Sequence, residues 1–538
     1  MLTALHALCL ALHSPAIQHP KPAETPRLVV VIAVDQLIPE QLQRLGPQLS
    51  GGFRRFLDEG AFFWRATVDY ANTETGPGHA TLATGRYPSH HGIVGNAFLL
   101  RDDSGEKQYV YCVGDALTPA GPNLGGAGSA SPAHLVGDAL GDLLAARVPG
   151  SRSVTLAGKD RAAVLLGGRA PDVALWWSGG GFTTSSYYAE KAPEFVGVWN
   201  SAWRERARGW KWEAELEGDP ATLGTAPDAR PGESRLGGGV LPRTLPADDS
   251  ALERAVVFTP LLDFFTLELA SLALDAVELG RDDALDYLGI SLSGCDILGH
   301  LYGPDSVEVT DLLLRDDREL GRFFALLDQE VGAGRWLACL SSDHGVLELP
   351  ESLAERGIGA RRVAPAEVTA MKELVKEALT FAHPEAGELG LSYSDLGFHF
   401  DEAAARAAGL EPAALRVLLA EAARESEWVA DAYPLEELLG GTPRDPWVTL
   451  YQRCQFPGRG PDVVLRPEPW LLFDAPEGTS HGSPYPYDRR VPLAFLGGKV
   501  KPQQRFDAAS PVDAVPTLFA LLALPVPEGL DGRVLKVD

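Results

Sequence analysis

Residues 28–35 read LVVVIAVD, an unbroken apolar run that stops at the carboxylate Asp35. A continuous β-branched run is typical of a strand that is buried on both faces in a parallel sheet. Three comparable runs follow along the chain, with two helical patterns among them: residues 287–292, 336–340 and 491–496, and residues 260–279 and 310–329. This alternation predicts an α/β fold with a doubly wound, mostly parallel sheet that is flanked by helices.

Two segments interrupt this alternation and are interpreted as insertions. Residues 160–250 are rich in Gly, Pro and Trp and are expected to form loops with short strands packed over the functional site. Residues 350–470 contain helix-like stretches and the strand-like sequence WVTLYQ at 447–452, which suits an inserted cap subdomain. The catalytic core would then comprise residues 27–349 together with residues 471–538.

The composition excludes several classes of function. The net charge of -26 argues against binding nucleic acid through a basic surface, which needs clustered Lys and Arg. The five cysteines form no C-x-x-C pair, so they predict no cysteine zinc site. Beyond the N-terminus no stretch is apolar enough to span a bilayer, so no integral membrane segment is expected.

The first 16 residues resemble a secretory signal. An apolar stretch is followed by Ser14, Pro15 and Ala16, small residues of the kind found at cleavage sites, although the usual positive start is missing. Residues 17–26 are Pro-rich and polar and are expected to be a disordered lead-in. These features predict a periplasmic or secreted protein, and a frayed N-terminal helix is the alternative interpretation.

Polar residues collect where the predicted strands end, which is where doubly wound sheets bind ligands. Several carboxylates and imidazoles in one crevice would place like charges together, and a pair of metal ions resolves that conflict. Mixed carboxylate and imidazole ligation favours zinc. The candidate ligands are Asp35, Asp296, His300, Asp343, His344 and His481.

A threonine in the stretch ANTETGPGHATLATGRYPSHHGIVGN, residues 71–96, raises a further question. Thr75 stands before Gly-Pro-Gly and an apolar run, which predicts a helix N-cap. The same hydroxyl could be a nucleophile, because a helix N-terminus favours alkoxide and phosphate oxygens. Both roles are compatible.

The quoted motifs together carry a family resemblance. VVIAVDQ, TGPGHATLATG with HGIVGN, SGCDILGHLYGP, SSDHG and HGSPYPYD are similar to the alkaline phosphatase superfamily, in its type I phosphodiesterase/nucleotide pyrophosphatase-like branch. The similarity extends from Val29 to the C-terminal SPVDAVPTLFALL and skips the insertions.

The resemblance implies a two-zinc site and a covalent mechanism. Asp296, His300 and His481 would hold one zinc ion, and the second would be held by Asp35, Asp343, His344 and the oxygen of Thr75. Thr75 would attack phosphorus and form a phosphothreonine that water then hydrolyses. Asn96 would donate its amide to a phosphoryl oxygen, and a turn residue after Gly95 is the alternative.

The sequence AGKDRAAV at 157–164 bears on substrate class. If the segment is extended, Lys159 and Arg161 point the same way, and added cations favour a phosphate monoester dianion over a diester. The K-x-R pattern resembles the PafA-like alkaline phosphatases. This implies a phosphate monoester hydrolase that releases inorganic phosphate, with phosphate itself as an inhibitor. Two solvated loop charges are the alternative.

Two other functions stay open at this point. A phosphodiesterase or nucleotide pyrophosphatase would share every metal ligand. A secreted, non-catalytic metal- or phosphate-binding protein could keep the same scaffold, although it has no need of Thr75.

Overall fold

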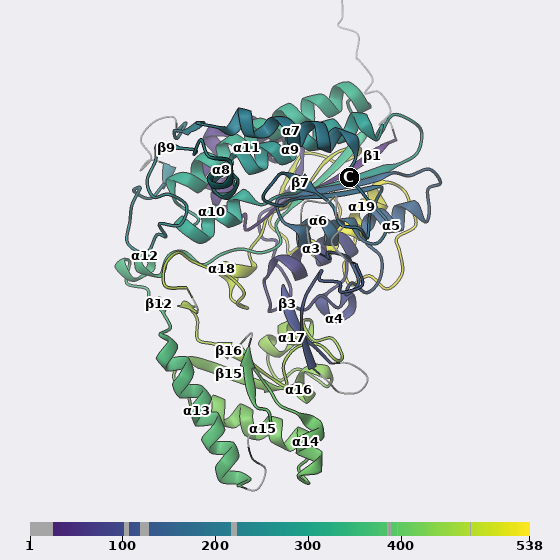
Figure 1. The fold of residues 1–538 in the computed structure, drawn as a ribbon. Helices are drawn as coiled ribbons and strands as arrows, with labels where there is room; N and C mark the ends of the chain where they lie inside the picture. The colour runs from purple at the N-terminus through teal and green to yellow at the C-terminus, as the bar shows by residue number, and fades with distance from the viewer. Residues whose placement is uncertain are drawn as a thin grey trace, which may run out of the picture.

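A computed structural model of the chain describes residues 25–101, 107–118, 129–216, 223–384, 387, 389–394, 396–473 and 475–538. The expected signal peptide, and all but the last two residues of the expected lead-in, lie outside these ranges. Figure 1 shows a large body, in which helices cover both faces of a sheet, and a smaller body beneath it.

The main sheet has the order β19-β2-β18-β11-β1-β10-β5-β6-β7. β1 lies at its centre and pairs in parallel with β10 and β11, so the predicted mostly parallel α/β fold is confirmed. The strands are β1 Leu28–Val34, β2 Ala61–Phe63, β5 Ser153–Ala157, β6 Val173–Trp177, β7 Phe182–Thr183, β10 Asp286–Leu292, β11 Trp336–Ser341, β18 Leu493–Gly497 and β19 Gln503–Arg505.

One predicted strand runs against the expected direction. The run at 491–496 forms β18, but this strand is antiparallel to both β11 and β2. Burial on both faces produces the same apolar run in either direction, so the sequence pattern could not distinguish the two.

The central strand contacts a separate hydrophobic cluster on each face. Val30 and Ile32 belong to one cluster, and Val29 and Val31 belong to the other, because successive side chains of a strand alternate. The first face is covered by α1 Pro39–Leu45, α2 Gly52–Glu59, α7 Glu194–Ala207, α9 Leu261–Ala276 and α11 Val307–Leu327. The second is covered by α3 Thr75–Thr84, α5 Leu140–Ala145, α6 Asp160–Gly167 and α19 Ala514–Leu521.

The prediction of loops for residues 160–250 was wrong. α6, β6 and β7 belong to the core, and α7 packs against α9 through Trp199 and Trp203. Gly and Trp in α7 broke the helical pattern that a single sequence shows, and tertiary packing decided the structure. The rest of the segment contains β8 Lys211–Trp212 and β9 Arg243–Thr244, and α8 Asp249–Ala255 follows.

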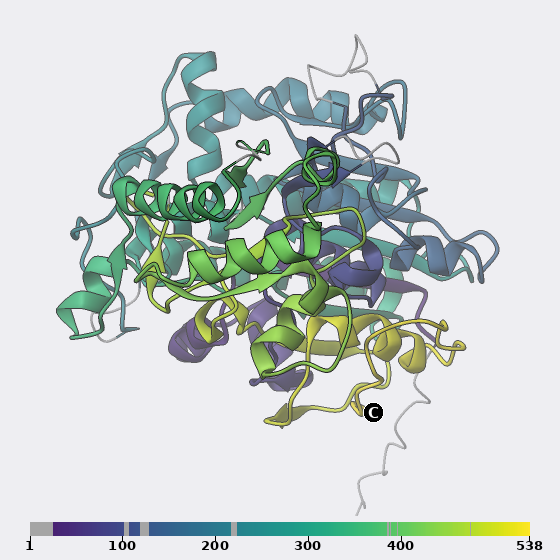
Figure 2. The ribbon, with the colours of Figure 1, turned by 90° about the horizontal axis from the view of Figure 1, so that it is seen from below.

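Residues 363–465 contain a hydrophobic core of their own, and we call this part the cap. Its sheet has the order β13-β14-β16-β15, and Figure 2 shows helices lying beside it. The boundaries at 350 and 470 stay a prediction. The elements are α13 Pro365–Ala382, β13 Ser392–Ser394, β14 Gly397–His399, α14 Glu402–Ala407, α15 Pro412–Ala423, β15 Val429–Pro434, α16 Leu435–Leu439, α17 Pro446–Gln452 and β16 Val463–Pro467.

The strand predicted at 447–452 is the helix α17. Asp445 caps it, because its carboxylate accepts from the N–H groups of Trp447 at 2.8 Å and Val448 at 3.0 Å. Pro446 fits the first helical position. These start signals outweigh the strand preference of the β-branched and aromatic residues that follow.

Short elements connect the core and the cap. The hairpin of β3 Ala97–Arg101 and β4 Lys107–Tyr111 reaches from the core toward the cap, where Leu100 bridges to Arg459. The other short elements are α4 Pro88–His91, α10 Gly294–Tyr302, α12 Pro350–Glu355, β12 Arg361–Arg362, β17 Leu471–Leu472 and α18 Pro486–Arg489.

Within the described ranges, no single helix meets the length and hydropathy that a membrane crossing requires. The bent pair Asp249–Phe258 and Leu261–Ala276 meets them only when its two helices are taken together.

Candidate active site

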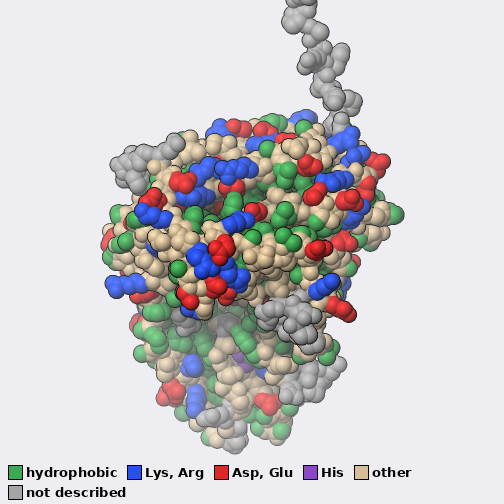
Figure 3. Space-filling view, turned by 45° about the horizontal axis from the view of Figure 1, so that its top comes forward, with side chains coloured by type: hydrophobic (Ala, Val, Ile, Leu, Met, Phe, Trp, Pro, Cys, Tyr) green, Lys and Arg blue, Asp and Glu red, His purple; other side chains and the backbone are tan. Residues whose placement is uncertain are grey.

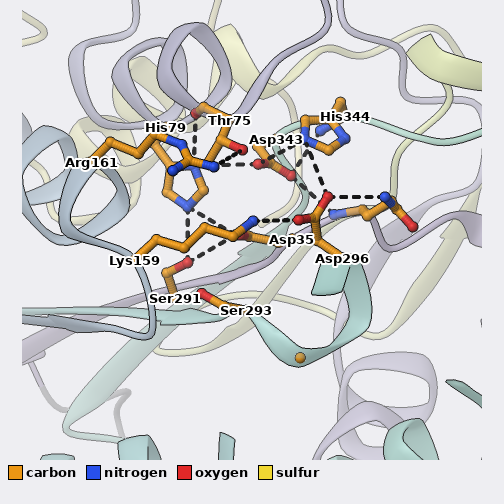
Figure 4. A network of polar contacts seen from close by, with 12 residues as sticks. Asp35, Thr75, His79, Lys159, Arg161, Ser291, Ser293, Asp296, Asp343 and His344 are labelled. Carbon is orange, nitrogen blue, oxygen red and sulfur yellow. Dashed lines mark hydrogen bonds and ion pairs between the residues drawn. The ribbon is translucent and has the colours of Figure 1, made fainter. Parts of the chain in front are cut away.

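The predicted site residues meet at the carboxyl ends of four neighbouring strands. Asp35 follows β1, Asp296 and His300 lie on α10 after β10, Asp343 and His344 follow β11, and Lys159 and Arg161 follow β5. Thr75 begins α3, and His481 lies in the loop before α18. Figure 4 shows seven of these side chains converging: Asp35, Thr75, Lys159, Arg161, Asp296, Asp343 and His344.

Asp296 is the centre of one group of candidate ligands. Its Oδ1 lies 3.2 Å from His300 Nε2 and 3.5 Å from His481 Nε2. The same oxygen accepts a hydrogen bond from the amide of Gln36 at 2.9 Å. The ligand atoms of Asp296, His481 and His344 all lie within 4.8 Å of one another, so one carboxylate and two imidazoles could hold a metal ion, and His300 contacts the same carboxylate from outside this group.

Asp35 and Asp343 define the second group. His344 Nε2 lies 3.2 Å from Asp343 Oδ2 and 4.0 Å from Asp296 Oδ1, so its ring lies between the two groups. Asp343 Oδ2 and His344 Nε2 are fully buried, and neither makes a hydrogen bond within the described part of the chain. Two unpaired ligand atoms that face each other fit a shared cation.

The three candidate ligand histidines are held in the same tautomer. His300 Nδ1 donates to the carbonyl of Thr479 at 2.8 Å, and His481 Nδ1 donates to the carbonyl of Thr73 at 2.6 Å. His344 Nδ1 donates to its neighbouring carbonyl at 3.0 Å. Each bond leaves Nε2 directed at the site, which is the arrangement that metal-binding histidines use. On His344 a bound metal ion would displace the Nε2 proton that Asp343 favours.

The buried carboxylates of the site favour positive charge on the groups beside them. Burial opposes ionisation of Asp296, but Lys159 and His300 outweigh it and hold the pKa of this carboxyl well below its usual range. Burial alone would lower the pKa of His344, but Asp343 raises it to about 9. Burial, and then His344, lower the pKa of His481 to about 4, so its ring is neutral and able to act as a ligand.

The sequence predicted that Thr75 is the N-cap of a helix. In the structure it is instead the first residue of α3. Glu74 occupies the capping position and makes no side-chain capping bond. The first turn approaches the sheet so closely that a Cβ on Gly78 would lie 2.4 Å from Asp343 Cβ. The helix therefore presents the Thr75 hydroxyl directly to the second group of candidate ligands.

Lys159 and Arg161 do not lie in one extended segment. Lys159 has extended backbone angles, and Arg161 lies in the first turn of α6. Their side chains nevertheless reach the same site. Lys159 Nζ lies 2.5 Å from Asp296 Oδ2 and 2.7 Å from Asp35 Oδ2, so its ammonium joins the two groups. Arg161 Nη2 lies 3.4 Å from Thr75 Oγ1.

Asn96 is tied to the start of α3. Its side-chain oxygen accepts from the N–H of Gly76 at 2.8 Å, and its backbone N–H donates to Glu74 at 2.6 Å. Because the amide oxygen is engaged, the NH2 group is the part of the side chain that can serve a ligand.

Sequence reasoning missed several residues that support this site. His79 lies 3.2 Å from Asp35 and 3.4 Å from Asp343. Ser291 donates to Asp35 at 2.9 Å. Gln36 contacts Asp296 and carries a left-handed φ of 66°. The available signals were the spacing of His79 one helical turn after Thr75 and the position of Gln36 directly after Asp35.

Comparisons with known proteins show what the chain is similar to. The family model for type I phosphodiesterase / nucleotide pyrophosphatase matches residues 29–453. Alkaline phosphatase PhoK of a Sphingomonas species is 31% identical over 96% of this chain and 92% of its own. A calcium-transporting ATPase of Myroides odoratus is 29% identical over 99% of this chain and 98% of its own. The crystal structure of wild-type alkaline phosphatase PafA superimposes with a TM-score of 0.85 at 28% identity, over 96% of this chain and 99% of that one.

Proposed function

The chain belongs to the type I phosphodiesterase/nucleotide pyrophosphatase family, and we propose that it is a zinc-dependent phosphate monoester hydrolase that acts through a phosphothreonine at Thr75. The alkaline phosphatases among its relatives support a phosphatase of this superfamily. Preference for monoesters, zinc as the metal and the two-step course are our proposals.

The observation that carries the proposal is the placement of one cation, Arg161, beside Thr75 and of a second, Lys159, between the two groups of candidate ligands. Arg161 lies 3.4 Å from the hydroxyl, and Lys159 joins the two carboxylates Asp35 and Asp296. A monoester dianion carries more charge on its non-bridging oxygens than a diester does, so these cations favour the monoester selectively. A diesterase has no comparable need of them.

Thr75 would act as the nucleophile. Its hydroxyl loses its proton to solvent, Oγ1 forms a bond to phosphorus, the bond between phosphorus and the alcohol oxygen breaks, and the departing alkoxide takes up a proton from solvent. Two zinc ions would lower the pKa of the Thr75 hydroxyl and offset the charge on the leaving oxygen. One would be held by Asp296, His300 and His481, and the other by Asp35, Asp343, His344 and Thr75.

The protein would stabilise the transferring phosphoryl group from several directions. Arg161 and Lys159 provide positive charge, and the NH2 group of Asn96 provides a neutral donor. The N-terminus of α3 adds the positive end of a helix dipole. Water then attacks phosphorus, the bond to Thr75 Oγ1 breaks, and inorganic phosphate leaves with net retention of configuration.

Further parts of the proposal concern ligands and location. Small-molecule phosphate monoesters are the proposed substrates, and inorganic phosphate is both product and competitive inhibitor. The proposed location, periplasmic or secreted, rests on the sequence of residues 1–16.

The test compares hydrolysis of p-nitrophenyl phosphate and bis-p-nitrophenyl phosphate by the zinc-loaded protein, before and after chelation. We expect a monoester preference that chelation abolishes and zinc restores. Arg161→Ala is expected to lower kcat/KM for the monoester by about 10²-fold or more and to spare the diester. Arg169→Ala is the matched control, because this arginine follows the same helix and its guanidinium contacts backbone carbonyls at 2.7 and 3.2 Å and the carboxylate of Asp138 at 3.9 Å, none of which belongs to the site.

Other outcomes favour the alternatives. Diester preference with an unchanged rate in Arg161→Ala would favour a phosphodiesterase. Tight phosphate binding without turnover of either ester would favour a binding protein.

A further inference from the structure

A cavity of about 210 Å³ lies beside the site, between the core and the cap. Its walls are mainly apolar and come from both bodies. The core contributes Val94, Ala97 and Phe98, and the cap contributes Leu396, Val464 and Leu465. Figure 3 shows histidine and hydrophobic side chains next to one another where the two bodies meet. The cavity therefore has one wall that belongs to the catalytic core and one that the inserted segment supplies.

The cavity lies on one particular side of the reaction centre. His481 lines it, and so does Glu74, which directly precedes Thr75. In the proposed mechanism, His481 belongs to the ligand group with Asp296 and His300, which serves the leaving oxygen. Lys159 and Arg161 line a separate pocket with Trp176 and Trp177. The cavity thus adjoins the alcohol oxygen of a bound ester, and the pocket of Lys159 and Arg161 is the one that carries the cations.

The lining does not suit a second charged group. Among the described residues that line the cavity, Arg459 is the one Lys or Arg, and its guanidinium donates to the carbonyls of Gly92 and His134, the latter at 2.6 Å. Its charge is therefore committed to the backbone of the core. A polyphosphate or a sugar phosphate leaving group would bring charge into a wall of Leu, Val, Ala and Phe, and burying unpaired charge is unfavourable.

We propose that this cavity binds the alcohol portion of the substrate and selects phosphate esters of apolar alcohols, above all those with an aromatic ring. The inference rests on the proposed function, because the leaving oxygen must lie at the His481 group. The size fits, since an apolar cavity of about 150 Å³ is large enough to bind benzene. The cap, through Leu396 and Val464, is then a determinant of specificity.

The test changes the cavity at Leu471, which lines it from β17 and is only partly buried. Leu471→Trp narrows the cavity and Leu471→Ala widens it. Leu439→Trp is the matched control, because Leu439 is 50% exposed on α16 of the cap and is not among the residues that line the cavity. For each protein, kcat/KM is measured with phenyl phosphate and with methyl phosphate. Each ester is compared between variant and wild type, so its intrinsic reactivity cancels.

We expect Leu471→Trp to lower kcat/KM for phenyl phosphate about tenfold or more while methyl phosphate changes by less than about twofold. Leu471→Ala is expected to shift preference toward naphthyl phosphate, and Leu439→Trp to change nothing. Equal losses on phenyl and methyl phosphate, or no loss on either, would overturn the proposal.

A binding measurement separates failure of this inference from failure of the proposed function. Calorimetry of phenylphosphonate and methylphosphonate on the same zinc-loaded proteins needs no turnover. If no ester is hydrolysed, the proposed function fails, and selective loss of phenylphosphonate affinity in Leu471→Trp still supports the cavity as a binding site. Equal affinities of wild type and Leu471→Trp for phenylphosphonate would overturn it.

Discussion

Two clusters of buried charge in this molecule differ in how completely their polar atoms are paired. The Asp462 cluster, made of Asp462, Arg101, Lys107, Arg416 and Glu402, joins the β3–β4 hairpin to the cap. Asp462 accepts from Arg101 at 3.1 Å, Lys107 at 2.7 Å and Arg416 at 2.9 Å, and its second oxygen also accepts a backbone N–H at 3.1 Å.

The site cluster, made of Asp35, Asp296, Asp343, His344 and Lys159, is equally buried and incompletely paired. Two carboxylates, Asp35 and Asp296, share the ammonium of Lys159. Asp343 Oδ2 and His344 Nε2 lie 3.2 Å from each other and make no hydrogen bond to the other described residues. Burial therefore does not separate a functional cluster from a structural one. The presence of buried polar atoms without hydrogen-bond partners does separate the two kinds of cluster. Such an atom costs free energy of folding unless a bound ligand pairs with it.

The largest effect is expected at Thr75. Thr75→Ala removes the proposed nucleophile and is expected to lower kcat for p-nitrophenyl phosphate by about 10⁴-fold or more. Because the hydroxyl makes only one long contact, 3.4 Å to Arg161 Nη2, the unfolding midpoint in urea is expected to change little. Thr75→Ser keeps a hydroxyl and is the matched control, with activity well above that of Thr75→Ala. A Thr75→Ala protein with more than a tenth of the wild-type rate would contradict the assignment.

The opposite pattern is expected at Asp462. Asp462→Ala removes the carboxylate that Lys107 pairs with and leaves Arg101 and Arg416 with Glu402 as their remaining shared partner. Breaking a buried ion pair costs about 3–5 kcal/mol of unfolding free energy. Urea unfolding followed by tryptophan fluorescence measures the loss. At temperatures where the variant is folded, kcat for methyl phosphate is expected to match wild type. A large loss of kcat in the folded variant would show that the two clusters are coupled.

The contribution of the Asp462 cluster to stability is also expected to depend on pH. Burial would raise the pKa of Asp462, but Lys107, Arg101 and Arg416 outweigh it and lower it to about 2. A depressed carboxyl pKa adds stability above the unfolded value of about 3.9, and about 2–3 kcal/mol is lost as the pH falls from about 4 to about 2. Urea unfolding at pH 5, 4, 3 and 2 measures this slope. The slope is expected to be smaller in Asp462→Asn, and parallel curves for the two proteins would rule out Asp462 as its source.

A smaller effect is expected at Asp263, a buried carboxylate that belongs to neither cluster. It accepts from the N–H groups of Ser293 at 2.9 Å and Gly294 at 3.0 Å and so fixes the start of α10, which carries Asp296 and His300. Asp263→Ala is expected to weaken zinc binding by about 10–100-fold, with kcat recovered at saturating zinc. Competition with a chelator measures the affinity. Asp275→Ala is the matched control, because Asp275 is an exposed residue on α9, the helix that also carries Asp263. Equal zinc affinities of the two variants would contradict a positioning role for Asp263.

The sequence was sufficient to predict the parts that local pattern determines. The apolar run that ends at Asp35 predicted the central strand, and the strand ends predicted which residues meet in the site. These predictions succeeded because β1, β10 and β11 are buried on both faces, and such strands produce a continuous apolar pattern.

The failures share a physical cause, which is that neighbouring elements decide what local pattern leaves open. The direction of β18 and the helix α7 depend on packing partners far along the chain. The Asp462 cluster could not be predicted from local pattern either, because Arg101 and Asp462 lie 361 positions apart in the sequence. At 447–452 the relevant signal was local. Asp445 and Pro446 are typical of a helix start, but the β-branched and aromatic residues that follow favoured a strand.

The close contact of α3 with the sheet has a consequence for how this scaffold can diversify. A single methyl group at position 78 would collide with Asp343, so the helix that begins at Thr75 cannot move closer to the sheet without displacing a candidate metal ligand. The site is thereby fixed to the core, while the cap carries no such restriction. We expect descendants of this scaffold to acquire new substrates through insertions and replacements in the cap, and to keep the geometry around Gly78 unchanged.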